Sequence, residues 1–418
     1  MKRKLALLLA LTLLLGLTAC NRAAEKADRG FDSARSFNHY FPVVNAAETT
    51  DTIYFISFSE QYLKYTDKAS GISGILCGKP ECRHEDKDCN AYLDWTKALF
   101  VKEERLYWIA SLDGLQYNLY SMALDATDRR TELELPQELT KTFSGLYLYT
   151  FDDDCLYLAD VKKEVVDGEP TYTNYVGAFP FDAKAEPYVI LQEESQYHYY
   201  GGTMMIQAYG GYLYILTTEE AGPVEAETAA PPYRLRLRRW DLVNGGMETL
   251  YEEQDHTPQS AYDLWVLDGA VLFSRDFDGE DFRHELCRYD LESGKCEHLF
   301  DVKERYGMSH VVDGLVSGQE LTWSDGAPDE FHVTLHDFEG NLLLDDVYRL
   351  DFPNEFAEED IPQLDLIGRD ENYVYYSFYT SVVDEAPAAT NYASIIRVAL
   401  DGGGAEILCT QSEKQVLA

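Results

Sequence analysis

Positive charge is scarce in this sequence. Only 35 of its 418 residues are lysine or arginine, against 74 aspartates and glutamates, and the formal net charge at pH 7 is -39. Nucleic acids and anionic membrane surfaces are recognised through clustered positive charge, so the composition excludes both as partners. The excess of carboxylates favours a well-solvated exterior.

Catalytic signatures are also missing. The sequence contains no nucleophile elbow G-x-S-x-G, no H-E-x-x-H motif and no P-loop. Among 74 acidic residues some pair of carboxylates is always available, so such pairs are not evidence for a glycosidase. Asp152-Asp153-Asp154 is therefore interpreted as an acidic turn.

Long hydrophobic runs are absent apart from one at the N-terminus. Residues 2–4 are basic, residues 5–17 form an apolar run, and Leu17-Thr18-Ala19-Cys20 ends in a small-residue cleavage site. The 13 apolar residues are too few for a good membrane-spanning helix. The segment predicts a signal peptide over residues 1–19 that resembles a bacterial lipoprotein signal. In the alternative, an ordinary secretory signal, Cys20 is incidental.

The lipoprotein interpretation predicts where the mature protein is located. We expect diacylglycerol on the sulfur of Cys20, which would hold the protein on the membrane as an extracytoplasmic, lipid-anchored molecule. Residues 20–36 are small and polar and predict a flexible linker. The folded domain is then expected over residues 37–418.

Sustained helical periodicity is absent after the signal, whereas tyrosine is abundant, with 31 residues against 5 tryptophans. A strand-like run that ends in aspartate and a turn recurs seven times, at intervals between 47 and 64 residues. The aspartates are Asp67, Asp125, Asp182, Asp241, Asp290, Asp337 and Asp401. Upstream of most copies lies a turn followed by an aromatic strand, as in DTIYFISF; the sixth copy has only the weaker DGLVSG.

Four short strands can be placed in each repeat, in the fourth at 204–209, 212–217, 233–240 and 247–251. Repeated units of four strands predict an all-β fold, a single β-propeller with seven four-stranded blades. Six or eight blades, or an antiparallel sandwich pair, remain alternatives. Two insertions, 166–174 and 219–232, are expected between second and third strands, the latter as a surface loop.

One local motif stands out, Cys77-Gly-Lys-Pro-Glu-Cys82-Arg-His84-Glu-Asp-Lys-Asp-Cys89. Three thiolates and one imidazole can form a tetrahedral structural zinc site, although the spacing matches no standard zinc ribbon or knuckle. A disulfide within the cluster suits an extracellular compartment and is the preferred interpretation. Unpaired thiols are the third possibility.

Beyond Cys20, seven cysteines remain, an odd number that cannot pair completely. Cys287 and Cys296 flank a predicted hairpin turn and are a second candidate disulfide. In each case the expected role is structural.

The signal, the short spacer, the segment LCGKPECRHEDKDCNAY and the repeats together resemble a group of uncharacterised lipoproteins from Gram-positive bacteria. Their repeats resemble the propeller domains of low-density-lipoprotein-receptor-related proteins. The resemblance covers nearly the whole chain, but only the cysteine segment is specific. It implies a propeller and a lipid anchor, and it implies no activity.

The absence of a catalytic motif and the loop-rich scaffold favour a non-catalytic module that binds a protein or glycan ligand. The alternative is an extracytoplasmic, glycan-active enzyme with carboxylates in the central channel. A structural accessory subunit of an exported complex is a third possibility.

Overall fold

The computed structural model describes residues 44–416, apart from 58–61, 85–87, 94–95, 97, 112–116, 137–147, 167–168, 183, 196–203, 221–232, 256–258, 278–282, 303–310, 313, 325–326, 352–362 and 386–387. All regular structure in this part is β-strand, and it contains no helix that could cross a membrane. The predicted signal and linker, including Cys20, lie outside the described residues.

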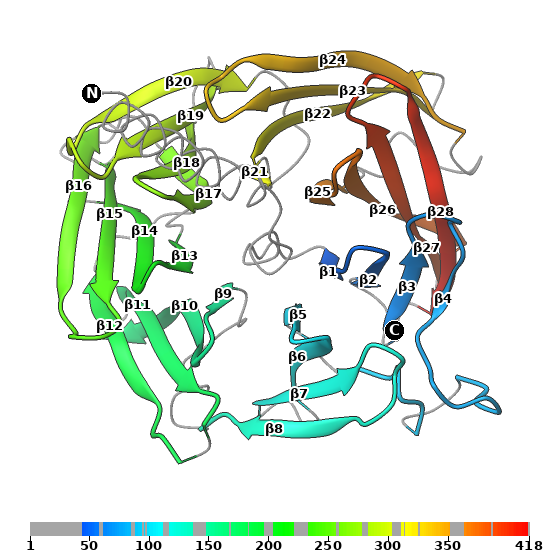
Figure 1. Cartoon of the computed structure of the whole chain (residues 1–418), viewed down its shortest axis with the longest axis horizontal. Helices are drawn as coiled ribbons and strands as arrows, with labels where there is room; N and C mark the ends of the chain where they lie inside the picture. The colour runs from blue at the N-terminus through cyan, green and yellow to red at the C-terminus, as the bar shows by residue number, and fades with distance from the viewer. Residues whose placement is uncertain are drawn as a thin grey trace, which may run out of the picture.

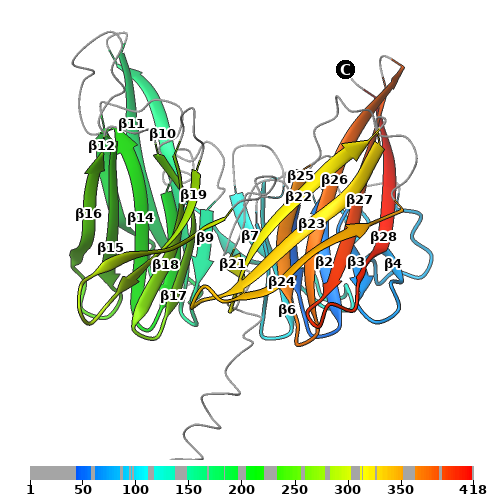
Figure 2. The same ribbon diagram turned by 90° about the horizontal axis from the view of Figure 1, so that it is seen from above.

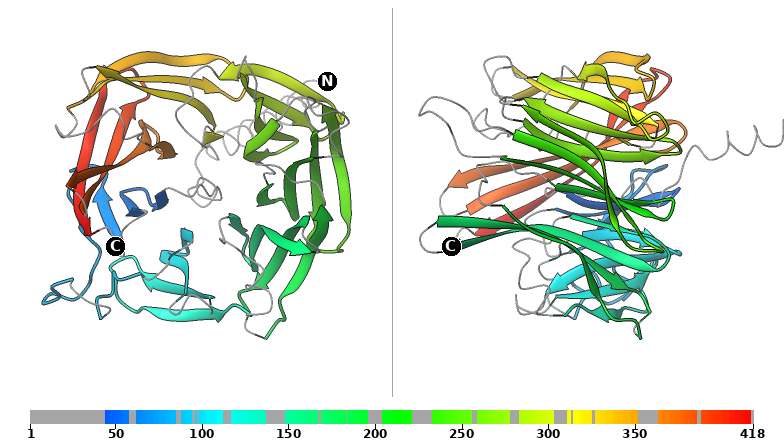
Figure 3. Two further views of the ribbon diagram at one scale, coloured as in Figure 1. Left: turned by 180° about the vertical axis from the view of Figure 1, so that it is seen from behind. Right: turned by 90° about the vertical axis from the view of Figure 1, so that its left-hand side faces the viewer.

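The described strands form seven four-stranded antiparallel sheets that surround a central axis as the blades of a propeller (Figure 1). Each blade uses four strands that are consecutive in sequence, and the first strand lies nearest the axis. The predicted all-β, seven-bladed propeller is confirmed. The ring is closed, which makes the sandwich and the other blade numbers wrong (Figure 3).

The first four blades lie between Val44 and Asp255. Blade 1 contains β1 (Val44–Glu48), β2 (Thr52–Ser57), β3 (Lys64–Asp67) and β4 (Ser73–Ile75). Blade 2 contains β5 (Ala98–Lys102), β6 (Arg105–Ser111), β7 (Tyr117–Ala123) and β8 (Arg130–Glu134). Blade 3 contains β9 (Leu148–Phe151), β10 (Cys155–Val166), β11 (Glu169–Pro180) and β12 (Tyr188–Ser195). Blade 4 contains β13 (Met204–Tyr209), β14 (Tyr212–Glu220), β15 (Tyr233–Asp241) and β16 (Met247–Asp255).

The last three blades complete the ring. Blade 5 contains β17 (Gln259–Leu267), β18 (Ala270–Phe277), β19 (Arg283–Asp290) and β20 (Cys296–Val302). Blade 6 contains β21 (Val311–Val312), β22 (Leu315–Ser324), β23 (Ala327–Asp337) and β24 (Leu342–Arg349). Blade 7 contains β25 (Gln363–Arg369), β26 (Tyr373–Glu385), β27 (Ala388–Ala399) and β28 (Ala405–Val416).

The hydrophobic core lies between neighbouring blades, because each sheet buries both of its faces. Between blades 2 and 3, for example, Phe100 stacks on Phe151 with ring centroids 4.5 Å apart, and Tyr149 donates a hydrogen bond to the Leu99 carbonyl at 2.8 Å. Edge and stacked aromatic pairs of this kind stabilise an interface beyond the area they bury. Strand packing thus accounts for a part of the tyrosine content.

The repeated aspartates all lie at the turn between the third and fourth strands. The carboxylate of each one accepts a hydrogen bond from a backbone N–H group two or three residues further along the chain. In blade 4, for example, Asp241 accepts from the N–H groups of Val243 and Asn244, at 2.9 and 2.8 Å. The turn role predicted for these residues is confirmed.

The insertion at 166–174 is a strand extension, since β10 and β11 remain paired up to Val166 and Glu169. The expected second insertion begins with the end of β14, and its remainder, 221–232, lies outside the described residues. Long β10–β11 and β26–β27 hairpins rise on one face of the ring (Figure 2). The turns between first and second strands lie on the opposite face (Figure 2).

Candidate metal centre and channel-mouth cavity

The cysteine loop, residues 77–89, belongs to the connection from blade 1 to blade 2. His84 adopts a left-handed backbone conformation with φ of 57°, and Lys79 donates a side-chain hydrogen bond to the Asp88 carbonyl. Just after the loop, Asn90 Nδ2 donates to the Ala126 carbonyl in the β7–β8 turn at 2.8 Å. The Lys79 bond closes the loop on itself, and the Asn90 bond holds its end against blade 2.

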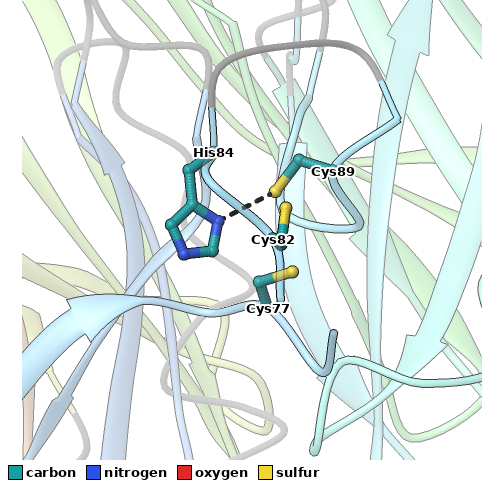
Figure 4. Close-up of side chains that lie close together, drawn as sticks. All are labelled: Cys77, Cys82, His84 and Cys89. Atoms are coloured by element: carbon teal, nitrogen blue, oxygen red, sulfur yellow. Dashed lines mark hydrogen bonds between the residues drawn. The ribbon is translucent and has the colours of Figure 1, made fainter. Parts of the chain in front are cut away.

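Cys77, Cys82, His84 and Cys89 converge within the loop (Figure 4). One ligand atom from each lies within 4.8 Å of the others, and His84 Nδ1 lies 3.3 Å from Cys89 Sγ. Tetrahedral zinc with bonds of about 2.0–2.3 Å places its ligand atoms roughly 3.3–3.8 Å apart. The cluster therefore could hold a metal ion, as one of the predicted interpretations requires.

The sulfur atoms of the loop have different surroundings. Cys89 is buried, and burial raises the pKa of its thiol to about 12. Burial acts in the same direction on Cys77, yet the pKa of Cys77 is lowered, because backbone N–H groups of Lys79 and Asn90 donate to its sulfur. None of the seven cysteines in the described part of the chain is disulfide-bonded. A disulfide within the cluster stays a prediction.

A cavity of about 910 Å³, here called the channel-mouth cavity, opens between the inner strands of the ring. It lies on the face opposite the long hairpins, where turns between the first and second strands of blades 1 to 4 meet. Its polar lining includes Thr49, Thr50, Asp51, Lys102, Glu103, Glu104, Asp152, Asp153 and Tyr209. Val101, Leu124, Phe151, Ala208 and Leu242 supply the apolar part.

The β5–β6 turn in this cavity has an unusual backbone. Glu103 and Glu104 both adopt left-handed conformations, with φ of 49° and 60°. The equivalent turn of blade 4 has φ of 60° and 83° but uses Gly210 and Gly211. Left-handed conformations cost a residue with a side chain roughly 1–2 kcal/mol. Two glutamates thus line the cavity at a cost in stability, and the carboxylate of Glu103 accepts a hydrogen bond from Lys102 Nζ at 3.0 Å.

The described lining of the cavity offers groups suited to recognition. Among the described residues that line it there is no serine, cysteine or histidine. Asp152 accepts hydrogen bonds from the N–H groups of Asp154 and Cys155 and from the Tyr157 hydroxyl, so its carboxylate serves the turn. The sequence interpretation of this triplet as an acidic turn is confirmed. Its place in a cavity was missed, because the lining is assembled from four blades.

Comparison with known proteins bears only on the fold of the chain. No family model and no curated protein matches the chain. A solved puromycin hydrolase matches with a TM-score of 0.50 and 14% identity, over 91% of this chain and 55% of that one. A structure of a prolyl endopeptidase matches with a TM-score of 0.47 and 11% identity, over 97% and 55%. The chain spans about half the length of these structures, and the likeness to the puromycin hydrolase shows the fold alone.

Proposed function

We propose that this protein is a lipid-anchored, extracytoplasmic propeller that binds a protein or glycan ligand at the channel-mouth cavity without transforming it. The observation that carries this proposal is the Glu103-Glu104 turn, whose strained backbone places two glutamates in the lining of the cavity. Backbone strain of this kind concentrates at functional sites. Glycines, as in blade 4, would form the same turn at lower cost.

The chemistry of the lining suits recognition. Carboxylates accept strong hydrogen bonds from sugar hydroxyls and from the ammonium or guanidinium groups of a basic protein segment. Aromatic side chains, here Phe151 and Tyr209, add apolar contact area. The rigid ring holds four turns in fixed positions, which limits the ordering cost of binding.

A glycan array and a pull-down from intact cells test this function with the full-length protein. The double variant Glu103→Gln/Glu104→Gln removes two charges and keeps the side-chain shape. Val165→Ser, at an exposed residue of β10 on the opposite face, is the control. We expect at least tenfold weaker ligand binding for the double variant and no change for the control. Failure of the wild type in both assays, or equal loss in both variants, would overturn the proposal.

A second candidate, a glycan-active enzyme, is favoured by the shared location of Asp51, Glu103, Glu104 and Asp153 in one cavity. Glycoside hydrolysis uses two carboxyl groups, one of which acts as an acid. Any oligosaccharide that binds in the array should be incubated with the protein and assayed for new reducing ends. Release of reducing ends that is lost in Glu104→Gln would replace the binding proposal with this one.

The lipid anchor on Cys20 has its own test. Cells that express the wild type or Cys20→Ala are labelled with radioactive palmitate and separated into membrane and soluble fractions. We expect label and membrane association only for the wild type. An unlabelled wild-type protein would identify the N-terminal segment as an ordinary secretory signal.

We also propose that Cys77, Cys82, His84 and Cys89 bind a structural zinc ion. A disulfide would use only two of the four groups, whereas a metal explains why all four converge. The expected result is one zinc per chain by elemental analysis and a thiolate-to-metal charge-transfer band after cobalt substitution. Cys82→Ser and His84→Ala should lower the metal content, and Cys155→Ser should not. A metal-free protein with two loop thiols resistant to alkylation until reduced would establish the disulfide instead.

A further inference from the structure

The cysteine pair of blade 5 has a defined geometry. Cys287 lies in β19 and Cys296 in β20, and the register pairs Cys287 with His298 and Tyr289 with Cys296. Opposite residues in an antiparallel pair project from the same face, so the two cysteines share a face, two positions apart. Their thiols hydrogen-bond to one another.

The pair lies at the boundary with blade 4. Cys287 is 1% exposed and belongs to a core cluster that includes Leu235 and Leu237 of β15. Cys296 lies half-buried at the edge of the same cluster, where the Tyr251 side chain hydrogen-bonds to its sulfur. One thiol is therefore accessible from the surface and the other lies behind it.

A guanidinium group accompanies the two sulfur atoms. Arg275 of β18 forms ion pairs with Glu253 at 2.8 Å and with Glu285 at 3.1 Å, and it acts electrostatically on both thiols. A nearby cation stabilises the thiolate, which is the reactive form of cysteine. The carboxylates paired with Arg275 oppose this effect, since Glu253 raises the pKa of Cys296 and Glu285 raises that of Cys287, but the pKa of Cys296 remains lowered. This pair thus combines contact with an accessible thiol of lowered pKa.

The remaining cysteines in the described part of the chain do not compete for the pair. Three belong to the cysteine loop of blades 1 and 2. Cys155 is buried in the cluster between blades 3 and 4, and Cys409 is buried between blades 7 and 1, where its sulfur lies 3.2 Å from Thr66 Oγ1. If the three thiols of the cysteine loop bind a metal ion, four of the seven cysteines remain. These are the pair Cys287 and Cys296 and two separate core thiols, Cys155 and Cys409.

We propose that Cys287 and Cys296 form a reversible disulfide that closes the outer hairpin of blade 5. The Cys296 thiolate attacks one sulfur of an external disulfide, such as oxidised glutathione, and releases one thiolate of the oxidant. The Cys287 thiol then gives its proton to that released thiolate and attacks the Cys296 sulfur, which releases the second thiolate. One disulfide is broken and one is formed, and two electrons pass from the protein to the oxidant.

The two thiols are suited to different steps. The pKa of Cys296 is lowered, first because the Cys287 thiol donates a hydrogen bond to its sulfur, with further contributions from Arg275 and Tyr251. The pKa of Cys287 is raised, by that same hydrogen bond and by burial. The accessible cysteine therefore attacks first and the buried one completes the exchange.

The test uses the full-length protein, equilibrated with reduced or oxidised glutathione, alkylated, and mapped by mass spectrometry without reduction. We expect a Cys287–Cys296 cross-linked peptide only in the oxidised sample, and free, alkylated thiols in the reduced one. Oxidation should raise Tm by about 3–6 °C, because the bond restricts the unfolded chain. Cys287→Ser and Cys296→Ser should lose both effects, and Cys155→Ser should keep them.

The peptide map needs no variant, so the proposal stays testable if either serine variant fails to fold. Two free thiols in oxidised wild-type protein would overturn it, as would cross-links to Cys155, to Cys409 or between molecules. Cys77→Ser removes one of the candidate metal ligands of the cysteine loop. If this variant still bound a metal ion through Cys287 and Cys296, the proposal would be overturned too. The result does not depend on the ligand-binding proposal, since neither cysteine lines the channel-mouth cavity.

Discussion

Gly71 lies where blade 1 meets blade 7, in the turn between β3 and β4. Its φ is 68°, and a Cβ atom at this position would lie 2.8 Å from the Leu408 carbonyl oxygen of β28. Gly210, in the β13–β14 turn, has a similar φ of 60° but open space around its Cβ position. Both backbones disfavour a side chain, and only Gly71 adds a clash with the backbone of a neighbouring blade.

We expect Gly210→Ala to lower the free energy of unfolding by about 1–2 kcal/mol, from backbone strain alone. Gly71→Ala should cost a further ~1–3 kcal/mol, because blade 7 must move to admit the methyl group. Urea denaturation of both variants measures the difference. Equal losses of unfolding free energy in the two variants would show that the backbone at Leu408 moves away without an energetic penalty.

At the Glu103-Glu104 turn the opposite change can be made, in which strained residues are replaced by residues that favour the turn. Asn and Gly are the residues that favour a two-residue turn with positive φ at both positions. Replacing the pair with Glu103→Asn/Glu104→Gly should therefore stabilise the protein by about 1–2 kcal/mol and weaken ligand binding. Denaturation and the binding assay check the two halves. A variant that gains stability and still binds would remove the functional explanation for the strain.

The sequence predicts residue-scale features when their partners are close in the chain. The turn aspartates contact backbone only two to four residues away, so seven copies could be recognised by pattern. The metal-ligating candidates likewise fall between Cys77 and Cys89. The cavity could not be predicted, because its lining joins residues from Thr49 to Leu242 that only ring geometry brings together.

At the scale of single elements, shortening the β10–β11 hairpin tests whether this element contributes to stability or to ligand binding. Its pairing continues to Val166 and Glu169. Val161 and Asn174 still pack into the protein, whereas Val165, further out, is 70% exposed. A long projecting hairpin of this kind can shorten without opening the core.

We predict that replacing residues 163–172 with an Asn-Gly turn changes the free energy of unfolding by less than about 1 kcal/mol. Ligand binding at the cavity, on the opposite face, should stay within twofold of the wild type. Circular dichroism with thermal melting and the binding assay test this. Lost binding in a well-folded variant would move the ligand site to the hairpin face.

All four strands of blade 4 begin at the residues predicted from the sequence, because each strand is flanked by Gly, Asp or Pro signals. The segment 166–174 was expected to be an insertion, and its described residues, 166 and 169–174, are paired strand. Its Asp-Gly dipeptide at 167–168 carries the signal of a two-residue hairpin turn, and the charged residues around it concealed the alternation. Blade 6 gave a weak signal because the start of β22, LVSG, has no aromatic residue.

At the scale of the whole molecule, the ring closes without a shared strand, since every blade is contiguous in sequence. The seam between blades 7 and 1 is therefore held by side chains. Phe55 and Ile53 pack against Tyr375 and Ile395. Arg397 of β27 donates a hydrogen bond to the Lys68 carbonyl of blade 1 at 2.6 Å.

A buried ion pair lies in this seam. Glu48 Oε2 is 2.7 Å from Lys68 Nζ, and Glu48 Oε1 is buried without a hydrogen-bond partner. Burial raises the pKa of Glu48 to about 7, an effect that Lys68 opposes and the nearby Asp370 reinforces. Protonation of Glu48 is thus easier in the folded ring than in the unfolded chain, whose carboxyl titrates near 4.5.

This difference gives the closed ring a pH dependence of known sign. Because the folded-state pKa lies above the unfolded value, the stabilisation by Glu48 is complete below pH 4.5 and is lost as the pH rises through 7. The stability of the wild type relative to Glu48→Gln should therefore fall between pH 5 and pH 8, by on the order of 2–3 kcal/mol. Exposed Glu292→Gln controls for the change in net charge. Urea denaturation of the three proteins across this pH range measures the change in stability. If the difference in stability between the wild type and Glu48→Gln stays constant with pH, Glu48 remains ionised beside Lys68. The attraction between the two charges across 2.7 Å would then outweigh the effect of burial at the seam.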